Sequence, residues 1–184
     1  MLRHIPNTIS VFRIFLVIPV IYLILKDSWE SAFILVLLAG VSDGLDGFLA
    51  RTFHWESKLG ATLDPVADKI LLVALFIVLG FKGVIPQWLV ILIIARDAVI
   101  ISGLMLYKLM TDDLKIRTLF ASKLNTALLI LFVLLHLFNL AVVAVPEYFF
   151  SILTMMIVVT TVVSGALYVI LWSLYFVKHT KEEV

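Results

Sequence analysis

Residues 41–69 read VSDGLDGFLARTFHWESKLGATLDPVADK, and this stretch decides both the fold and the chemistry. Two apolar runs flank a polar connector, and each run carries a pair of aspartates near the point where it meets the connector. Residues three or four apart lie on the same face of a helix. We therefore expect two helices joined by a turn, with four carboxylates converging in one pocket: Asp43, Asp46, Asp64 and Asp68.

Four carboxylates in one pocket need positive charge beside them, because most of them would otherwise take up protons. Hard oxygen ligands favour Mg²⁺, Mn²⁺ or Ca²⁺. Two such ions can hold both the attacking and the leaving oxygen of a phosphoryl centre. Glycines at Gly44, Gly47 and Gly60 let a ligand approach the backbone closely. The stretch therefore predicts metal-assisted chemistry on a phosphate ester.

Each aspartate also has a purely structural interpretation. Asp64 followed by Pro65 is a favourable helix start, and Asp68 could pair with Lys69 or Lys123. However, acidic side chains inside membrane segments mark functional sites by default. Four of them with glycines at fixed offsets favour a functional site over a set of helix caps and ion pairs.

The composition places the chain in a membrane. Of its 184 residues, 63% are hydrophobic, compared with about 45–50% in soluble domains, and the mean hydropathy is +1.17. The net charge of +1 provides no basic surface for nucleic acid. The absence of cysteine excludes disulfides, thiolate metal sites and cysteine nucleophiles.

Six apolar stretches are long enough to span a bilayer, which takes about 20 helical residues. We therefore predict an all-α integral membrane protein in which residues 1–184 form a single domain. The N-terminal sequence lacks a small-residue cleavage site, so we expect it to be retained as a short interfacial helix. The six predicted transmembrane helices are 9–26, 31–50, 64–82, 86–108, 118–141 and 148–177.

Lys and Arg are unevenly distributed between the connectors, and this bias orients the spans. With the N-terminus inside, only Lys26 and Lys82 lie on the outer side. Both termini and the carboxylate pocket would then face the cytoplasm, in a bacterial inner membrane or, in a eukaryote, the mitochondrial inner membrane. The basic residues on the cytoplasmic side would be Arg3, Arg51, Lys58, Lys108, Lys115, Arg117, Lys178 and Lys181.

The spacing of the aspartates resembles the signature of the CDP-alcohol phosphatidyltransferase family, and the similarity covers essentially the whole chain. The resemblance implies transfer of a phosphatidyl group from CDP-diacylglycerol to an alcohol, with release of CMP. It also implies six spans, a homodimer, and two divalent cations, Mg²⁺ or Mn²⁺. The matching pattern is Asp43-x2-Asp46-Gly47-x2-Ala50-Arg51-x8-Gly60-x3-Asp64-x3-Asp68.

The resemblance also implies roles for single residues. Asp43, Asp46 and Asp64 would be metal ligands, and Asp68 would be both a metal neighbour and the general base that deprotonates the acceptor hydroxyl. A guanidinium grips phosphate through a permanently charged fork, which suits Arg51 to a phosphate of the donor. The residues expected to bind CDP-diacylglycerol are Asn7, Asp43, Gly47, Ala50, Arg51 and Gly60.

Arg96 and Lys123 lie within the predicted fourth and fifth spans. A cation within a membrane segment needs an anion nearby. The anion could belong to the protein, with Arg96 paired to Asp97 or Lys123 to one of the four aspartates. Alternatively, the two cations could together bind a phosphate of the acceptor. That alternative disfavours choline, ethanolamine and inositol as acceptors.

The residues around Lys123 narrow the choice of acceptor. The glycerophosphate branch of the family carries Arg-Glu in the fourth span and Gly-Lys-x-Lys-Thr in the fifth. This chain has Arg96-Asp97 in the fourth span, and SKLNT at 122–126 places Asn125 where that branch has its second lysine. These variants look more like the eukaryotic-type cardiolipin synthases of the family, whose acceptor is phosphatidylglycerol. We therefore expect Arg96, Lys123 and Asn125 to bind phosphatidylglycerol, with glycerol-3-phosphate as the alternative acceptor.

The reaction expected from these residues is direct in-line attack without a covalent enzyme intermediate, since the chain has no cysteine and suggests no Ser–His pair. A cation or proton transporter is the rival from another class. It would predict carboxylates distributed across the bilayer and broken helices at the midplane. Here the four aspartates gather at one end of their spans, which favours the enzyme.

Overall fold

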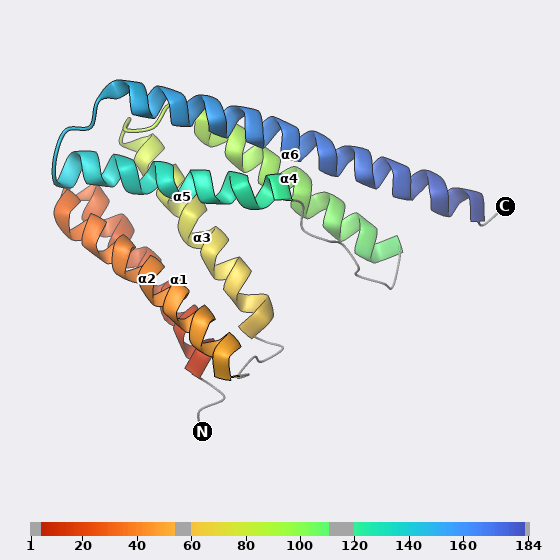
Figure 1. Ribbon diagram of the computed structural model, residues 1–184, viewed down its shortest axis with the longest axis horizontal. Coiled ribbons are helices and arrows are strands. Elements are labelled where there is room, and N and C mark those ends of the chain that lie inside the picture. The colour runs from red at the N-terminus through yellow and green to blue at the C-terminus, as the bar shows by residue number, and fades with distance from the viewer. Residues whose placement is uncertain (1–4, 54–59, 111–119, 183–184) are drawn as a thin grey trace. The chain divides into compact units, whose positions relative to one another are not determined.

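The computed structural model is all-helical over the residues that it describes, so the all-α part of the predicted fold class is confirmed (Figure 1). It describes the backbone of residues 5–53, 60–110 and 120–182, and the side-chain surroundings of residues 15–42, 69–103, 105 and 120–173. The helices in these ranges are α1 (Ile5–Leu25), α2 (Trp29–Phe53), α3 (Gly60–Phe81), α4 (Gln87–Met110), α5 (Phe120–Ala141) and α6 (Glu147–Glu182).

Two helix starts differ from the predictions. α1 is continuous from Ile5 to Leu25, so the prediction of a separate interfacial helix ahead of the first span is wrong. Pro6 stands in the first turn of α1, where a missing N–H costs no helical hydrogen bond. Nothing therefore interrupts the helix there. α3 begins at Gly60, so Asp64 lies inside the helix and does not start it.

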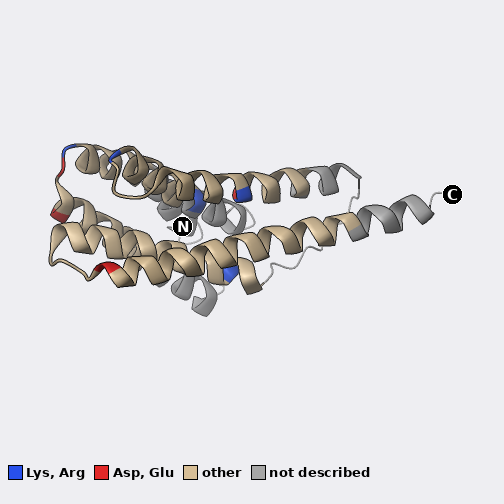
Figure 2. Cartoon of the chain, turned by 90° about the horizontal axis from the view of Figure 1, so that it is seen from above, with Lys and Arg blue, Asp and Glu red and all other residues tan. Residues whose placement is uncertain are grey.

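Two helical segments are long and apolar enough to cross a bilayer, Phe120–Ala141 and Glu147–Ser173. Only 39% and 28% of their most apolar windows are buried. An apolar surface of this extent favours contact with lipid over contact with water. Shorter apolar segments occur in the described parts of α1, α2 and α3. Charged side chains are sparse along the described helices (Figure 2). The structure thus agrees with a membrane protein, whereas the number of spans stays a prediction.

The described contacts divide the chain into two compact units, and the prediction of a single domain stays a prediction. The first unit comprises residues 1–86 and 133–145, and in it α1 packs against both α2 and α3. An edge-on ring contact joins Phe33 of α2 to Phe138 of α5, with centroids 5.8 Å apart. The fully buried side chains of this unit include Val20, Ile24, Ala32, Phe76, Leu79 and Leu137.

The turns that follow α1 and α3 are tied together in the first unit. Lys82 Nζ lies 2.7 Å from Asp27 Oδ1 and 5.9 Å from the centroid of the Trp29 ring. Gly83 adopts a φ of +73°, the left-handed conformation that commonly ends a helix. Lys82, one of the two cations predicted on the outer side, therefore has its charge compensated within the protein.

The second unit comprises residues 87–132 and 146–184, and in it α4 packs against α6. The face that α6 buries has a four-three-four spacing, typical of one helix face, with Ile157, Thr161, Ser164 and Tyr168. Trp172 continues this face and covers Gly103 of α4, where an added Cβ would lie 1.6 Å from the indole ring. The close approach of the two helices at Gly103 therefore requires a residue without a side chain.

Candidate functional site

The two aspartate pairs lie on continuous helices, as the motif requires. Asp43 and Asp46 are in the last part of α2, and Asp64 and Asp68 are in the first part of α3. Members of each pair are three or four residues apart and therefore share a helix face. All four side chains lie outside the residues whose surroundings the structure describes. The metal site and the catalytic role of Asp68 stay predictions.

The same limit applies to the residues expected to bind the donor. The structure places Asn7 in α1, Gly47, Ala50 and Arg51 in α2, and Gly60 at the start of α3. Their side-chain surroundings also lie outside the described residues. The chemistry of the four expected metal ligands can still be judged from their residue type. Four carboxylates are the hard oxygen ligands that Mg²⁺ and Mn²⁺ prefer, so the residues present fit the cations that the motif implies.

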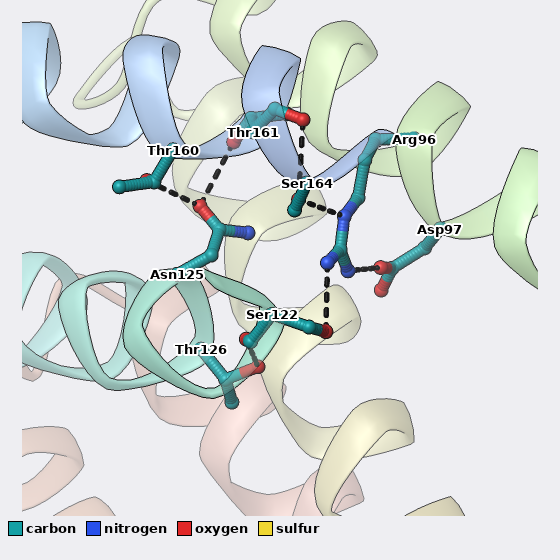
Figure 3. Close-up of polar contacts among 8 residues, drawn as sticks. All are labelled: Arg96, Asp97, Ser122, Asn125, Thr126, Thr160, Thr161 and Ser164. Carbon is teal, nitrogen blue, oxygen red and sulfur yellow. Dashed lines mark hydrogen bonds and ion pairs between the residues drawn. The ribbon is translucent and has the colours of Figure 1, made fainter. Parts of the chain in front are cut away.

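Arg96 is the best-defined candidate in the second unit, and its side chain is only 6% exposed. The guanidinium is held from three helices (Figure 3). Nε donates to Ser164 Oγ of α6 at 3.0 Å, and one terminal nitrogen donates to Ser122 Oγ of α5 at 2.8 Å. The other terminal nitrogen forms an ion pair with Asp97 Oδ1 of α4 at 2.6 Å. Three of the five guanidinium N–H bonds are thus directed to protein oxygens.

The ion pair with Asp97 compensates the charge of Arg96. Pairing inside the protein was one of the two interpretations open for Arg96, and the structure shows that the pairing exists. A buried guanidinium without a carboxylate would be strongly unfavourable. The pair as a whole is neutral, so Arg96 presents hydrogen-bond donors without adding net charge to its surroundings.

Asn125 of α5 is 1% exposed and faces α6. Its Oδ1 accepts hydrogen bonds from Thr160 Oγ1 and Thr161 Oγ1, both at 2.9 Å. Its Nδ2 is buried and has no hydrogen-bond partner in the part of the chain that the structure describes. Figure 3 shows that this nitrogen points toward the side on which Ser164 and Arg96 lie. Asn125 and Arg96 are therefore joined to neighbouring residues of α6.

Lys123 does not join this cluster. It lies on α5 beside Ser122, but its side chain is exposed. Within the described part of the chain it forms no ion pair. Convergence of Lys123 and Arg96 on an acceptor phosphate was one of two interpretations, and the other paired Lys123 with one of the four aspartates. The side chains of those aspartates lie outside the described residues, so the role of Lys123 stays a prediction.

Four hydroxyl residues of this cluster were not singled out as functional from the sequence: Ser122, Thr160, Thr161 and Ser164. A usable signal was present in the sequence. Residues 160–165 read TTVVSG inside a long apolar run, and small hydroxyl residues in such runs commonly hydrogen-bond to neighbouring helices. Their spacing places Thr161 and Ser164 on one face.

Comparison with known proteins gives relatives with two activities. A cardiolipin synthase (CMP-forming) of Rattus norvegicus is 35% identical over 145 residues, covering 70% of this chain and 48% of the relative. One of Streptomyces coelicolor is 36% identical over 105 residues, covering 53% and 48%. A CDP-diacylglycerol–glycerol-3-phosphate 3-phosphatidyltransferase of Cereibacter sphaeroides is 44% identical over 108 residues, covering 54% and 48%. The matched region is thus about half the length of each of these relatives.

A sequence profile described as CDP-alcohol phosphatidyltransferase matches residues 3–178, nearly the entire chain. The match includes both aspartate pairs and the α4–α5–α6 cluster around Arg96. It confirms the family resemblance that the motif carries. The chain belongs to the CDP-alcohol phosphatidyltransferase family.

Proposed function

We propose that this protein transfers the phosphatidyl group of CDP-diacylglycerol to phosphatidylglycerol, forming cardiolipin and CMP. The observation that carries the proposal is the complete aspartate motif at 43–68 inside a family match over residues 3–178. Relatives named as cardiolipin synthases from a mammal and a bacterium support the choice of product.

On the donor side, Asp43, Asp46, Asp64 and Asp68 would hold two divalent cations, Mg²⁺ or Mn²⁺, which counter the negative charge of the pyrophosphate when bound. Arg51 grips a phosphate, while Gly47, Ala50 and Gly60 leave room for the nucleotide and Asn7 lies near it. These residues orient CDP-diacylglycerol so that its diacylglycerol-bearing phosphorus is open to attack from the side opposite to CMP.

Asp68 then removes the proton of the acceptor hydroxyl. The hydroxyl oxygen forms a bond to the diacylglycerol-bearing phosphorus while the bond from that phosphorus to the bridging oxygen of CMP breaks. CMP leaves with the electron pair of that bond, and the proton stays on Asp68 until water takes it. No covalent bond to the enzyme forms.

On the acceptor side, Arg96 and Asn125 donate hydrogen bonds, and Lys123 approaches from the exposed side of α5. A phosphodiester carries one negative charge, whereas a phosphomonoester carries up to two. The neutral Arg96–Asp97 pair, at 2.6 Å, and the uncharged Asn125 favour the phosphodiester of phosphatidylglycerol. Glycerol-3-phosphate is the second candidate, because the relative from Cereibacter sphaeroides is named for that acceptor.

We further propose six membrane spans formed by α1 to α6, both termini and the donor pocket on the cytoplasmic side, and a homodimer. The membrane would be a bacterial inner membrane or the mitochondrial inner membrane. The distribution of Lys and Arg and the apolar surfaces of α5 and α6 support this placement.

The deciding experiment supplies the purified protein with CDP-diacylglycerol and Mg²⁺ or Mn²⁺, and with phosphatidylglycerol or glycerol-3-phosphate in separate tubes. CMP and the lipid product are then identified. Cardiolipin supports the proposal, and phosphatidylglycerophosphate alone would replace the acceptor while keeping the reaction. Product from inositol or serine only would refute the acceptor argument. Failure to release CMP with any alcohol would refute the reaction and reopen the transporter hypothesis.

A further inference from the structure

Ser164 connects α6 to Arg96 with a defined direction of hydrogen bonding. Its Oγ accepts from Arg96 Nε at 3.0 Å and donates to the Thr161 carbonyl at 3.2 Å. A hydroxyl has a single proton, so the Ser164 oxygen turns its lone pairs to Arg96. The next residue, Gly165, lies against the aliphatic part of Arg96, because an added Cβ would stand 3.7 Å from Arg96 Cγ. α6 therefore contacts both the aliphatic part and the guanidinium of the Arg96 side chain.

Thr161 fixes the orientation of the Asn125 amide. Thr160 Oγ1 is also within 2.8 Å of the Met156 carbonyl and 3.1 Å of the Ile157 carbonyl, so its single proton has competing backbone acceptors. Thr161 Oγ1 has Asn125 Oδ1 as its acceptor, at 2.9 Å. The Thr161 proton thus holds the amide oxygen against α6. The amide nitrogen must then point to the other side, as Figure 3 shows.

The consequence is a pair of side chains whose N–H groups are not all accepted by the described residues. Asn125 Nδ2 is buried without a partner among the described residues. A buried donor left without a partner is unfavourable, and such a group in a native protein calls for an explanation. Arg96 has two guanidinium N–H bonds beyond the three that protein oxygens receive. Both residues can therefore donate to the oxygens of a ligand.

We propose that Thr161 and Ser164 are positioning residues, which orient Asn125 and Arg96 so that the N–H groups not accepted by the described residues bind oxygens of the acceptor alcohol. This inference rests on the proposed function, because that function assigns Asn125 and Arg96 to the acceptor. It extends the acceptor site to α6, a helix outside the aspartate motif. It applies to phosphatidylglycerol and to glycerol-3-phosphate alike, since both offer phosphate oxygens.

A simpler role must be distinguished from this one. Hydroxyl residues in apolar helices often serve only to attach neighbouring helices. If Thr161 and Ser164 did no more than this, their loss would lower thermal stability and the fraction of active protein. The KM values for the two substrates would then change by the same factor. A positioning role predicts a selective effect on the acceptor.

The test uses Thr161→Val and Ser164→Ala in the full-length protein in nanodiscs, with the acceptor that wild type uses. Loss of the orienting bond should raise the KM for the acceptor about tenfold, with the KM for CDP-diacylglycerol and kcat changed less than about twofold. Thr161→Ser keeps the hydroxyl, so its KM for the acceptor should stay at the wild-type value. Ser151→Ala is the matched control, because Ser151 lies exposed on α6 and, among the described residues, its hydroxyl donates to the Glu147 carbonyl of the same helix.

Equal changes in both KM values, or a fall in kcat alone, would overturn the positioning role. So would an acceptor KM that stays at the wild-type value in Thr161→Val and Ser164→Ala, or one that rises in Thr161→Ser. In each of these cases an active wild type leaves the proposed function standing. A wild type that forms no lipid product would refute the proposed function and the positioning role together.

Discussion

Replacing Asp97 by asparagine tests whether the Arg96–Asp97 pair sets the charge that the acceptor meets. The substitution keeps the size of the side chain and an oxygen that can accept from Arg96, but it removes the charge. Deleting one partner of a buried ion pair costs about 3–5 kcal/mol. The Asp97 side chain is 17% exposed, and the remaining amide oxygen still accepts a hydrogen bond. We therefore expect a smaller loss in the free energy of unfolding, about 1.5–3 kcal/mol, typical of a charge-assisted hydrogen bond.

The same substitution should change acceptor preference. Once the charge of Arg96 is no longer neutralised, its attraction should improve the binding of a dianionic phosphomonoester more than the binding of a monoanionic phosphodiester. An energetic difference of about 1.4 kcal/mol corresponds to tenfold. We expect a rise of about that size in the ratio of kcat/KM for glycerol-3-phosphate to kcat/KM for phosphatidylglycerol. The ratio is measured with both acceptors on the same preparation in nanodiscs, alongside thermal unfolding.

Asp27→Asn is the matched control for Asp97→Asn. Asp27 pairs with Lys82 at 2.7 Å, but its side chain is 59% exposed, and exposed ion pairs contribute about 0–1 kcal/mol. Its replacement should leave the acceptor ratio unchanged. If Asp97→Asn also left both the ratio and the unfolding temperature at their wild-type values, the charge argument for the acceptor site would be refuted.

Three further substitutions test other parts of the proposal. Asp68→Asn should abolish turnover while CDP-diacylglycerol still binds, as measured by equilibrium binding; near-normal turnover would exclude Asp68 as the base. Asn125→Lys should favour glycerol-3-phosphate in the acceptor comparison, and it should lower the unfolding temperature because Asn125 is 1% exposed; an unchanged preference would remove Asn125 from the acceptor site. Gly103→Ala should destabilise the protein by about 1–3 kcal/mol through overpacking, since its Cβ would meet Trp172 at 1.6 Å; an unchanged unfolding temperature would show that the α4–α6 contact can open there.

The helical class and the family could be predicted because each rests on long or redundant patterns. Apolar runs of about 20 residues in a membrane almost always form helices. The aspartate motif has fixed residues at fixed spacings, and this pattern identifies the family. Helix starts were harder to predict. Pro6 and Asn7 suit the end of one segment or the first turn of a continuous helix equally well, and only the structure shows that α1 runs through them.

The acceptor cluster was only partly predictable, for a physical reason. Arg96 in an apolar segment must find an anion, but the sequence offers both Asp97 and a substrate phosphate as partners. The roles of the α6 hydroxyls are harder still to predict, because serine and threonine in a helix can donate to backbone carbonyls of the preceding turn. Thr160 has backbone acceptors at Met156 and Ile157 as well as Asn125, whereas the hydrogen bond given for Thr161 Oγ1 goes to Asn125 across the helix interface. That difference depends on which face of α6 meets α5.

The length of α6 has a practical consequence for determining orientation. Its 36 residues extend about 54 Å at 1.5 Å per residue. A hydrocarbon layer about 30 Å thick accommodates only about 39 Å of helix even at a tilt of 40°, the steep end of the observed range. In the proposed spanning arrangement, about ten residues of α6 therefore lie outside the hydrocarbon layer, and the charged sequence after Ser173, VKHTKE at 177–182, marks the end that does. An antibody or protease applied to one face of sealed vesicles can reach this projecting end without disturbing the bilayer, and so report which face carries it.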